Sequence, residues 1–384
     1  MRIGLDARWI FRELSGIGAN TRELIRALAQ ADRANEYVLF FNDLAVLEET
    51  AEFAGLEQAP NCTTHFVPFG PFSLRGQLLL PHEFRRHRLD VFHSTNYMIP
   101  LCAFPRRRKG RTACVVTIHD VIPLLFPDHA PKALKTRLFP LFRWLMREVG
   151  RRADAIIAVS RSTRADVLRE LRLPAEREPQ VVVVPNGVAP EFKPAPRAPH
   201  GPKTILYVGR LDPYKNVVRL IEAFGRLAAE HVADVRLRIV GADDPRYPEA
   251  RQRAAALGLG HRLDWTGHVS GGELVQAYQQ ADVFALPSRY EGFGLTVLEA
   301  MACGTPVVCS NTSSLPEVAG DAALFVPPGD VPALAHALRR VLTEPPLWAE
   351  LSAKGLRQAA PFTWTRTAEQ TIKVYEQVAA TAGG

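Results

Sequence analysis

Long apolar runs, closely paired cysteines and an export signal are all missing from this sequence of 384 residues. No segment reaches 18 uninterrupted apolar residues, so we expect no bilayer-spanning helix. Met1 leads into a short apolar stretch without the basic region and cleavage site of a secretory signal, which predicts a cytoplasmic protein. No two cysteines have the spacing of a zinc knuckle, so buried reduced thiols are expected. The cysteines are Cys62, Cys102, Cys114, Cys303 and Cys309.

The sequence also lacks a D-x-D triplet of acidic residues. Asp243 and Asp244 follow a predicted strand and are the candidate pair for a metal ion. Adjacent acidic residues directly after a strand are more typical of a turn, and we favour that interpretation. We therefore predict no metal site and no tightly bound cofactor.

Charge is distributed unevenly along a chain of otherwise ordinary globular composition, with 47% apolar and 23% charged residues. The formal net charge is +7, yet residues 101–152 alone hold 12 basic and 3 acidic residues, a local charge of +9. A local basic patch indicates an anionic partner such as a phosphate, a membrane surface or nucleic acid.

The basic stretch combines a loop with a predicted amphipathic helix that begins at Pro140. The loop contains Arg106, Arg107, Arg108, Lys109 and Arg111. Leu141, Phe142, Leu145, Met146 and Val149 share one face of the helix, Arg143, Arg147 and Arg151 lie opposite, and Trp144 is at the edge. Either the helix packs on its own domain with a solvated basic face, or residues 105–152 contact the inner face of an anionic membrane peripherally. Aromatic residues are not interleaved on the basic face, which argues against nucleic acid.

Short β-branched runs alternate with longer helical patterns, which predicts βαβ units with parallel sheets. The predicted strands are 2–7, 36–42, 62–68, 91–95, 113–119, 155–160 and 181–185, then 203–209, 236–241, 263–266, 282–287, 306–310 and 323–326. A proline-rich stretch over 186–203 reads as a linker, after which the pattern restarts. We therefore predict an α/β protein of two Rossmann-like domains, 1–190 and 191–362.

The most informative segment runs from Asp282 to Pro306. A predicted strand leads into a glycine-containing loop, and a helix follows from about Leu295. Ligands bind at the carboxyl ends of parallel strands, where a helix N-terminus favours a phosphate. Glu291 and Glu299, eight residues apart, are carboxylates suited to bind vicinal hydroxyls, and we expect both to line a wet cleft. From spacing alone, solvated acids at a helix entry explain the pattern equally well.

Two further turns are candidates for phosphate binding. Arg210 and Lys215 follow the strand that opens the second half, at the same sheet edge as Glu291, and two cations there can neutralise a diphosphate without a metal. From position alone, surface salt bridges explain the two cations equally well. In the first half, Gly16 and Gly18 mark a glycine turn at a helix start. This turn does not match the G-x-G-x-x-G pattern, so it indicates NAD only weakly.

A polar pair, His119 and Asp120, ends the strand at 113–119. A side chain at the carboxyl end of a central strand is well placed to meet a ligand. A single histidine is more often structural, and that interpretation is stronger still for His93, which ends the preceding strand.

Together these motifs resemble the retaining glycosyltransferases of family four, which have the GT-B fold, two Rossmann-like domains that face each other across a cleft. The resemblance covers nearly the whole chain. Its most specific element is E-G-F-G-L-T-V-L-E-A-M-A-C-G-T-P-V-V from Glu291, which resembles the family's E-x7-E motif. G-R-L-D-P-Y-K-N at 209–216, A-D-A-I-I-A-V-S at 153–160 and V-P-N-G-V at 184–188 are similar to further family segments.

The resemblance implies a role for each candidate residue. Glu291 would meet sugar hydroxyls, Glu299 the ribose, and Arg210 and Lys215 the diphosphate leaving group. Gly16 and Gly18 would close over the phosphates, His119 would contact the donor sugar with Asp120 beside it, and the base would stack near Val269. The amides that would hold the sugar and phosphate belong to Gly292, Phe293, Gly294, Leu295 and Thr296. The C-terminal segment 363–384 would cross back onto the first domain.

The donor and acceptor are less closely defined. T-I-H-D-V-I-P-L-L-F-P-D at 117–128 resembles bacterial mannosyltransferases of surface-polysaccharide synthesis, which favours GDP-mannose over a UDP-hexose or a deoxysugar donor. The acceptor would be a glycan or a lipid-linked sugar. The alternatives are a nucleotide-sugar 2-epimerase on the same fold and a non-enzymatic basic scaffold that binds membranes.

Overall fold

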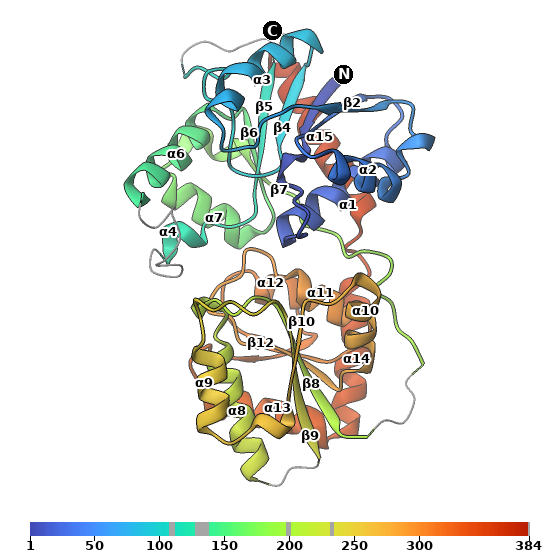
Figure 1. Ribbon diagram of the computed structural model, residues 1–384, viewed down its shortest axis with the longest axis vertical. Coiled ribbons are helices and arrows are strands. Elements are labelled where there is room, and N and C mark those ends of the chain that lie inside the picture. The colour runs from blue at the N-terminus through green and yellow to red at the C-terminus, as the bar shows by residue number, and fades with distance from the viewer. Residues whose placement is uncertain (107–111, 127–137, 197–200, 231–233, 383–384) are drawn as a thin grey trace. The chain divides into compact units, whose positions relative to one another are not determined.

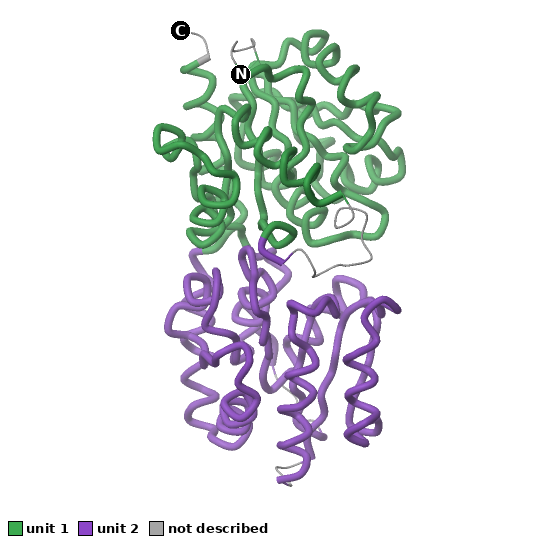
Figure 2. Tube along the Cα trace, turned by 90° about the vertical axis from the view of Figure 1, so that its left-hand side faces the viewer, with its two compact units in different colours: residues 1–124, 138–187, 362–384 green, residues 125–137, 188–361 purple. Residues whose placement is uncertain are grey.

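The computed structural model describes residues 1–106, 112–126, 138–196, 201–230 and 234–382. The chain forms two compact units, shown in different colours in Figure 2. Unit 1 comprises Met1–Leu124, Leu138–Gly187 and Phe362–Gly384, and unit 2 comprises Leu125–Arg137 and Val188–Pro361. Each unit has one parallel sheet covered by helices (Figure 1).

Unit 1 is built on a seven-stranded parallel sheet in the order β3-β2-β1-β4-β5-β6-β7. The strands are β1 (Arg2–Asp6), β2 (Glu36–Phe41), β3 (Cys62–Phe66), β4 (Val91–Ser94), β5 (Ala113–Ile118), β6 (Ala155–Ala158) and β7 (Val181–Val183). The central strands β4, β5 and β6 are buried along their whole length, which explains why they are mostly apolar, although β4 ends in the buried polar residues His93 and Ser94. The direction of the crossovers reverses between β1 and β4, so this unit's topological switch point lies there.

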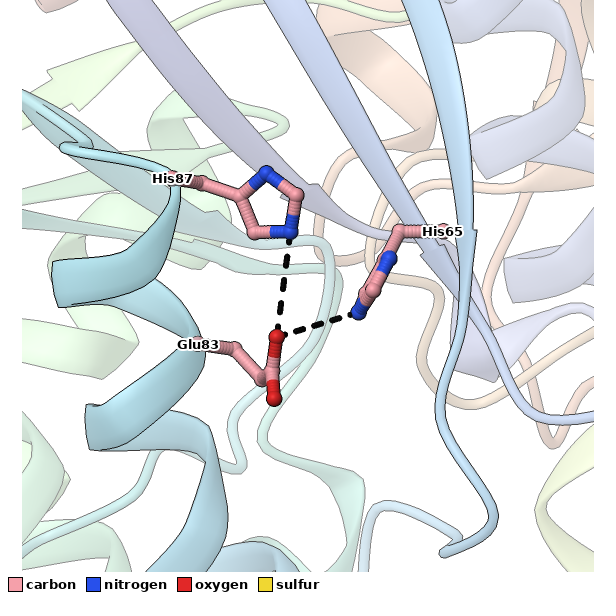
Figure 3. Close-up of side chains that lie close together, drawn as sticks. All are labelled: His65, Glu83 and His87. Carbon is pink, nitrogen blue, oxygen red and sulfur yellow. Dashed lines mark ion pairs between the residues drawn. The ribbon is translucent and has the colours of Figure 1, made fainter.

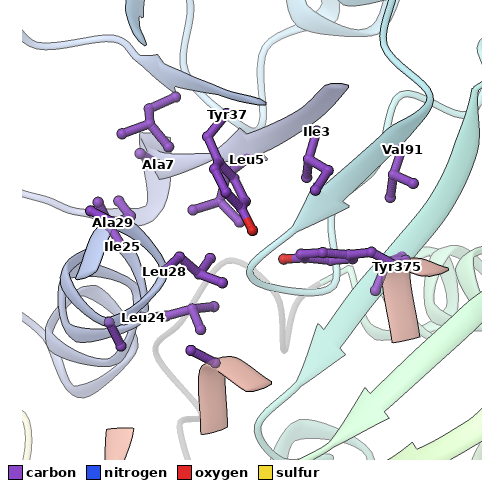
Figure 4. Close-up of a cluster of buried hydrophobic side chains, with 14 of the residues drawn as sticks. Ile3, Leu5, Ala7, Leu24, Ile25, Leu28, Ala29, Tyr37, Val91 and Tyr375 are labelled. Atoms are coloured by element: carbon purple, nitrogen blue, oxygen red, sulfur yellow. The ribbon is translucent and has the colours of Figure 1, made fainter. Parts of the chain in front are cut away.

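The helices of unit 1 are α1 (Gly16–Ala31), α2 (Leu44–Ala54), α3 (Leu74–Arg86), α4 (Ile122–Leu125), α6 (Phe139–Arg152), α7 (Arg161–Glu170) and α15 (Trp364–Ala382). Although α15 ends the chain, it packs on α1 and supplies Tyr375 to the core of unit 1 (Figure 4). Tyr375 Oη lies 2.6 Å from His93 Nδ1, and His93 Nε2 lies 2.8 Å from Thr117 Oγ1. His93 is therefore a structural residue whose two ring nitrogens are both satisfied.

Unit 2 has a six-stranded parallel sheet in the order β10-β9-β8-β11-β12-β13. Its strands are β8 (Lys203–Val208), β9 (Val235–Val240), β10 (Leu263–Gly267), β11 (Val283–Leu286), β12 (Val307–Ser310) and β13 (Ala323–Val326). Its helices are α8 (Val217–Ala229), α9 (Glu249–Ala256), α10 (Gly271–Gln280), α11 (Leu295–Ala302), α12 (Leu315–Ala319), α13 (Val331–Thr343) and α14 (Pro345–Ala359). The crossovers reverse between β8 and β11, which places the switch point of this unit at the turns after those strands.

The predicted α/β class with two parallel sheets is confirmed, and every predicted strand is present with its ends shifted by at most two residues. The predicted orientation of the amphipathic helix, α6, needs correction. Phe142, Met146 and Val149 are buried as expected, but Leu141 is 56% exposed and Trp144 is 48% exposed.

The reason for this orientation of α6 is Glu148, which is fully buried and forms ion pairs with Arg106, Arg151 and Arg152. These contacts hold the pKa of Glu148 down, to about 2, with the Arg106 hydrogen bond as the largest cause. Arg106 and Arg151 are therefore partners of a buried carboxylate and do not form part of a free basic face. The other basic loop residues, 107–111, lie outside the described part of the chain.

Candidate functional site

The switch point of unit 2 brings the turns after β8 and β11 side by side. The two strands pair directly, and the turn after β8 leads through a short 3-10 helix (Pro213–Lys215) into α8. The Arg289 amide donates to the Tyr214 carbonyl at 2.8 Å, and Asn216 Nδ2 donates to the Pro287 carbonyl at 3.1 Å. These bonds between the two turns fix the position of the loop that contains Glu291.

Lys215 and Glu291 form a bidentate ion pair at this switch point. Lys215 Nζ lies 2.7 Å from Oε1 and 2.9 Å from Oε2 of Glu291. Glu291 is 8% exposed, and the Lys215 side chain is also mostly buried. Arg210 lies in the same turn, but it pairs with Asp212, and its side chain is mostly exposed. Lys215 is thus the cation that contacts Glu291, and Arg210 remains accessible to a ligand from solvent.

The loop after β12 braces the Glu291 loop from the other side. The Glu291 amide donates to Ser313 Oγ at 2.9 Å, and Ser314 Oγ donates to the carbonyls of Glu291 and Phe293. Ser313 adopts a φ of 52°, a left-handed conformation that is uncommon for a residue other than glycine. Neither serine was among the predicted site residues, because nothing in their local sequence distinguishes them from loop residues.

The N-terminus of α11 follows this loop and has no side-chain cap. Gly294 has a φ of 94°, and a side chain there would place its Cβ 2.8 Å from Leu315 Cδ2, so the position requires glycine. Gly294 occupies the N-cap position of α11 with no side-chain hydrogen bond to the helix. Leu295 and Thr296, both half-buried, begin the helix, while Gly292 and Phe293 are buried behind it. The first-turn amides and the helix dipole favour an anion at this end.

Glu299 lies just over one turn into α11 and is more enclosed than expected. It is 9% exposed, and its Oε2 accepts a 2.7 Å hydrogen bond from the hydroxyl of Tyr278 on α10. Burial raises the pKa of Glu299 to about 7. The wet cleft that we expect around the two glutamates is therefore wrong in degree: both side chains are nearly buried, and each has one fixed protein partner. The sequence contained no signal for Tyr278.

The remaining sheet-edge turns of unit 2 lie close together. The Gly241 amide donates to the Gly267 carbonyl at 2.9 Å, and a Cβ on Gly241 would lie 2.0 Å from the Gly209 carbonyl oxygen. Val269 is half-buried just after β10, beside the capping box that starts α10. These turns occupy the carboxyl edge of the sheet.

The acidic pair after β9 has partners of its own. Asp243 forms an ion pair with Arg251, and Asp244 forms one with Arg246. Asp244 Oδ1 also accepts a hydrogen bond from the Arg246 amide at 3.0 Å, as acidic residues in turns commonly do. Both carboxylates are thus held by arginines.

In unit 1, His119 follows β5 at the carboxyl edge of the sheet. Its Nε2 lies 2.9 Å from the Thr95 carbonyl oxygen, which can only accept, so Nε2 carries the proton and Nδ1 keeps its lone pair. Burial lowers the pKa of His119, which favours this neutral form. Asp120 Oδ1 accepts the Ile122 amide at 2.9 Å at the start of α4. Both residues are half-buried.

The glycine turn of unit 1 starts α1, as its sequence suggests, and its two glycines differ. The Gly18 amide donates to Ser15 Oγ at 3.2 Å, and a Cβ on Gly18 would lie 3.2 Å from Leu14 Cδ1, with the backbone of Trp9 and Ile10 at contact distance. Gly18 therefore serves close packing and the helix cap. Gly16 is exposed at the first position of the helix, with open space where a Cβ would be.

Two Rossmann-like units, each with polar groups at the carboxyl edge of a parallel sheet, define the GT-B class of glycosyltransferase folds. A family model described as "Glycosyl transferases group 1" matches residues 188–358, and a second, "Glycosyltransferase Family 4", matches residues 14–192. The chain therefore belongs to the glycosyltransferase family that combines these two domains.

The relatives extend this assignment. The O-antigen chain mannosyltransferase B of Escherichia coli is 30% identical, with 94% of this chain and 96% of that protein covered. The MMP alpha-(1->4)-mannosyltransferase of Mycolicibacterium hassiacum is 34% identical over 80% of this chain and 75% of its own. Among solved structures, Anabaena Alr3699/HepE in complex with UDP-glucose has a TM-score of 0.75 at 18% identity and covers 98% of this chain and 100% of its own. The chain is thus a glycosyltransferase that resembles mannosyltransferases of surface-polysaccharide synthesis.

Proposed function

We propose that this glycosyltransferase transfers mannose from GDP-mannose to a glycan or lipid-linked acceptor, with retention of the anomeric configuration and without a metal ion. The observation that carries the proposal is the Lys215–Glu291 pair beside the N-terminus of α11, which has no side-chain cap. A cation and a helix dipole meet there at one switch point, and both favour a diphosphate.

The proposed mechanism begins with the departing diphosphate. Charge develops on its outer phosphate as the bond to the sugar breaks, and Lys215, Arg210 and the first-turn amides of α11 stabilise that charge. Each charge-assisted hydrogen bond contributes about 1.5–3 kcal/mol. Glu291 exchanges part of its contact with Lys215 for the sugar hydroxyls, and Glu299 binds the ribose diol through the oxygen that Tyr278 leaves free.

Residues of unit 1 act on the sugar end of the donor in this proposal. The lone pair on His119 Nδ1 accepts a hydrogen bond from a donor hydroxyl, and Asp120 supports the turn beside it. Gly16 lets its backbone approach a phosphate closely, and Gly18 holds the turn in shape. Each candidate carboxylate already has a protein partner: Glu291 pairs with Lys215, Glu299 accepts from Tyr278, and Asp120 accepts from the Ile122 amide. We therefore assign none of them as a dedicated nucleophile and propose attack on the face from which the diphosphate leaves.

The choice of mannose rests on the relatives, since two of them are named as mannosyltransferases. A thermal-shift panel of GDP-mannose, UDP-glucose, UDP-GlcNAc and dTDP-deoxysugars tests it, because a tight ligand raises the melting temperature. We expect the largest rise with GDP-mannose. A larger rise in melting temperature with a UDP-sugar would mean that the donor is that UDP-sugar and not GDP-mannose. The site assignment would be unchanged.

Stereochemistry and metal dependence have separate tests. Proton NMR of early product should show the anomeric configuration of the donor, and an inverted centre would refute the retaining mechanism. Transfer should survive EDTA, and loss that magnesium or manganese restores would refute a metal-independent mechanism. ManNAc formed from UDP-GlcNAc without an acceptor would indicate the 2-epimerase alternative, which the relatives do not favour.

A peripheral membrane contact through α6 is the second part of the proposal. Among the described residues, no helix has the length and apolar character needed to cross a membrane. Leu138, Leu141 and Trp144 are exposed apolar residues at the N-terminal end of α6, with exposed Arg143 between them. An apolar edge with adjacent basic charge suits the inner face of an anionic membrane, where a lipid-linked acceptor would be held.

A further inference from the structure

An imidazole–carboxylate–imidazole cluster lies in unit 1, on elements that carry none of the proposed donor contacts. His65 is on β3, Glu83 is on α3, and His87 directly follows α3 (Figure 3). We propose that these three side chains bind a divalent transition-metal ion, with Zn²⁺ as the best fit and water as the fourth ligand. The ion would serve a structural role and take no part in sugar transfer.

The geometry of the cluster suits zinc. Glu83 and His87 are four residues apart, so they share one side of α3 and its C-terminal turn. His65 Nε2 lies 3.1 Å and His87 Nε2 lies 3.7 Å from Glu83 Oε2, and all the ligand atoms lie within 4.8 Å of one another. Ligands at about 2.0–2.1 Å from a tetrahedral zinc are separated by roughly 3.3 Å, within the range seen here.

Two of the ligand atoms lack hydrogen bonds. Glu83 Oε2 and His87 Nε2 are buried atoms without a hydrogen-bond partner among the described residues, although His65 lies close to the carboxylate. Buried polar atoms nearly always have a hydrogen-bond partner. Two neighbouring buried atoms without one therefore indicate that a ligand binds between them. A metal ion that accepts lone pairs from both atoms would satisfy them together.

The surroundings hold the imidazoles in place. The buried ring of Phe40 makes edge contacts with His65 and His87, at centroid distances of 5.6 and 5.9 Å. All three ligand side chains keep partial exposure, between 17% and 25%, so solvent can supply a water as the fourth ligand. Such prearranged imidazoles reduce the ordering that binding requires.

Chemistry selects the class of ion. Two imidazoles and one carboxylate suit zinc and its transition-metal neighbours, whereas magnesium and calcium prefer oxygen ligands throughout. Two cations nearby oppose binding: Arg86 Nη1 lies 3.7 Å from Glu83 Oε2, and Arg2 Nη1 donates to the His87 carbonyl. Arg86 is mostly exposed and free to turn toward solvent when the ion binds.

Binding of the metal ion is expected to link α3 to the edge strand of the unit 1 sheet. β3 is the outermost strand beside β2, and it contributes His65, whereas α3 contributes the other two ligands. A metal ion would tie the end of α3 to this edge strand. Since such an ion binds the folded state alone, a free concentration of 100 times its Kd would raise the folded-to-unfolded ratio about 100-fold.

The test is calorimetric titration of chelator-stripped, tag-free full-length protein with Zn²⁺. We expect one site per chain, with at least a tenfold loss of affinity in His65→Gln, Glu83→Gln and His87→Gln. His82→Gln is the matched control, because His82 is an exposed histidine on the same helix. Absence of a one-to-one site in the wild type, or equal loss in His82→Gln, would overturn the proposal.

Thermal unfolding keeps the test valid for variants that fold poorly. Each protein is its own reference, measured with and without Zn²⁺. Wild type and His82→Gln should melt at a higher temperature with Zn²⁺, whereas His87→Gln should show a smaller rise at the same Zn²⁺ concentration. A rise in His87→Gln equal to that of the wild type would place the ion elsewhere, and transfer activity should be unchanged in all of these variants.

Discussion

Lys215 Nζ lies 2.7 Å and 2.9 Å from the two carboxylate oxygens of Glu291, across 76 residues of sequence. In the proposed mechanism, the lysine serves the diphosphate and the glutamate serves the sugar. In the ligand-free protein, Lys215 and Glu291 therefore bind each other. When the nucleotide sugar binds, Lys215 would contact its diphosphate and Glu291 its sugar, so recognition of the sugar is coupled to neutralisation of the leaving group.

Lys215→Ala is expected to weaken GDP binding roughly 10- to 100-fold, because one charge-assisted hydrogen bond is lost. Calorimetry with GDP measures this change. Lys354→Ala is a suitable control, since Lys354 is an ion-paired surface lysine on α14 of the same unit. Unchanged GDP affinity in Lys215→Ala would move the phosphate site elsewhere.

Glu291→Gln should behave differently from Lys215→Ala. It keeps the lysine and removes the carboxylate that competes with GDP, so GDP affinity should be equal or higher. Sugar transfer should nevertheless fall by at least tenfold, because the contact with the donor hydroxyls is impaired. Weaker GDP binding in Glu291→Gln would mean that the ion pair orients the lysine and does not compete for it.

Glu299 predicts a pH dependence of nucleotide binding. Its pKa is raised to about 7 by burial, so the carboxylate that would bind the ribose is lost as the pH falls through 7. GDP affinity should decrease over about one pH unit on either side of that value, and Glu299→Gln should show a flatter profile. An unchanged profile in Glu299→Gln would assign the pH dependence to another group.

The raised pKa of Glu299 affects folding stability in the opposite direction: stability decreases as the pH rises. The folded protein holds the Glu299 proton more tightly than the unfolded chain, in which the pKa is near 4.5. This contribution to the free energy of unfolding is therefore present at low pH and is lost as the pH rises from 4.5 through about 7. Denaturant unfolding of Glu299→Gln against wild type over this range isolates the effect.

Membrane contact should depend on the exposed end of α6. Leu141→Glu combined with Trp144→Glu should abolish sedimentation with anionic liposomes, and wild-type sedimentation should weaken as salt rises. Both side chains are exposed, so the substitutions leave the core intact. Leu257→Glu, at an exposed leucine of unit 2, is the control. Sedimentation that persists in the double variant would leave α6 with a packing role alone.

Tyr375→Phe should lower the free energy of unfolding by about 1–3 kcal/mol, because His93 Nδ1 would lose its partner inside the core. His93 stays neutral near pH 7, since burial lowers its pKa to about 3. Chemical denaturation measures the loss. Thr381→Ala, an exposed position on the same helix, should change stability by no more than a few tenths of a kcal/mol. Equal effects of the two substitutions would rule out the His93 hydrogen bond as the cause.

Much of the fold was predictable because its signals are local. A buried parallel strand needs a short apolar run that ends at a glycine, a proline or a polar residue, and each run that we predicted as a strand is one in the structure. The segment from Glu291 to Glu299 was equally readable, because its loop glycines and its helix pattern are neighbours in sequence. The family assignment followed from the same segment.

Side-chain partnerships were decided by the tertiary structure alone. The rotation of α6 followed the buried charge of Glu148 and its arginines, although an apolar wheel predicted Leu141 on the inside. Tyr278 reached Glu299 from another helix, and Ser313 and Ser314 reached the Glu291 loop from another strand. Local periodicity determines which segments form strands and helices. Which polar groups meet depends on sheet order, register and helix rotation, and these are set by the packing of the whole unit.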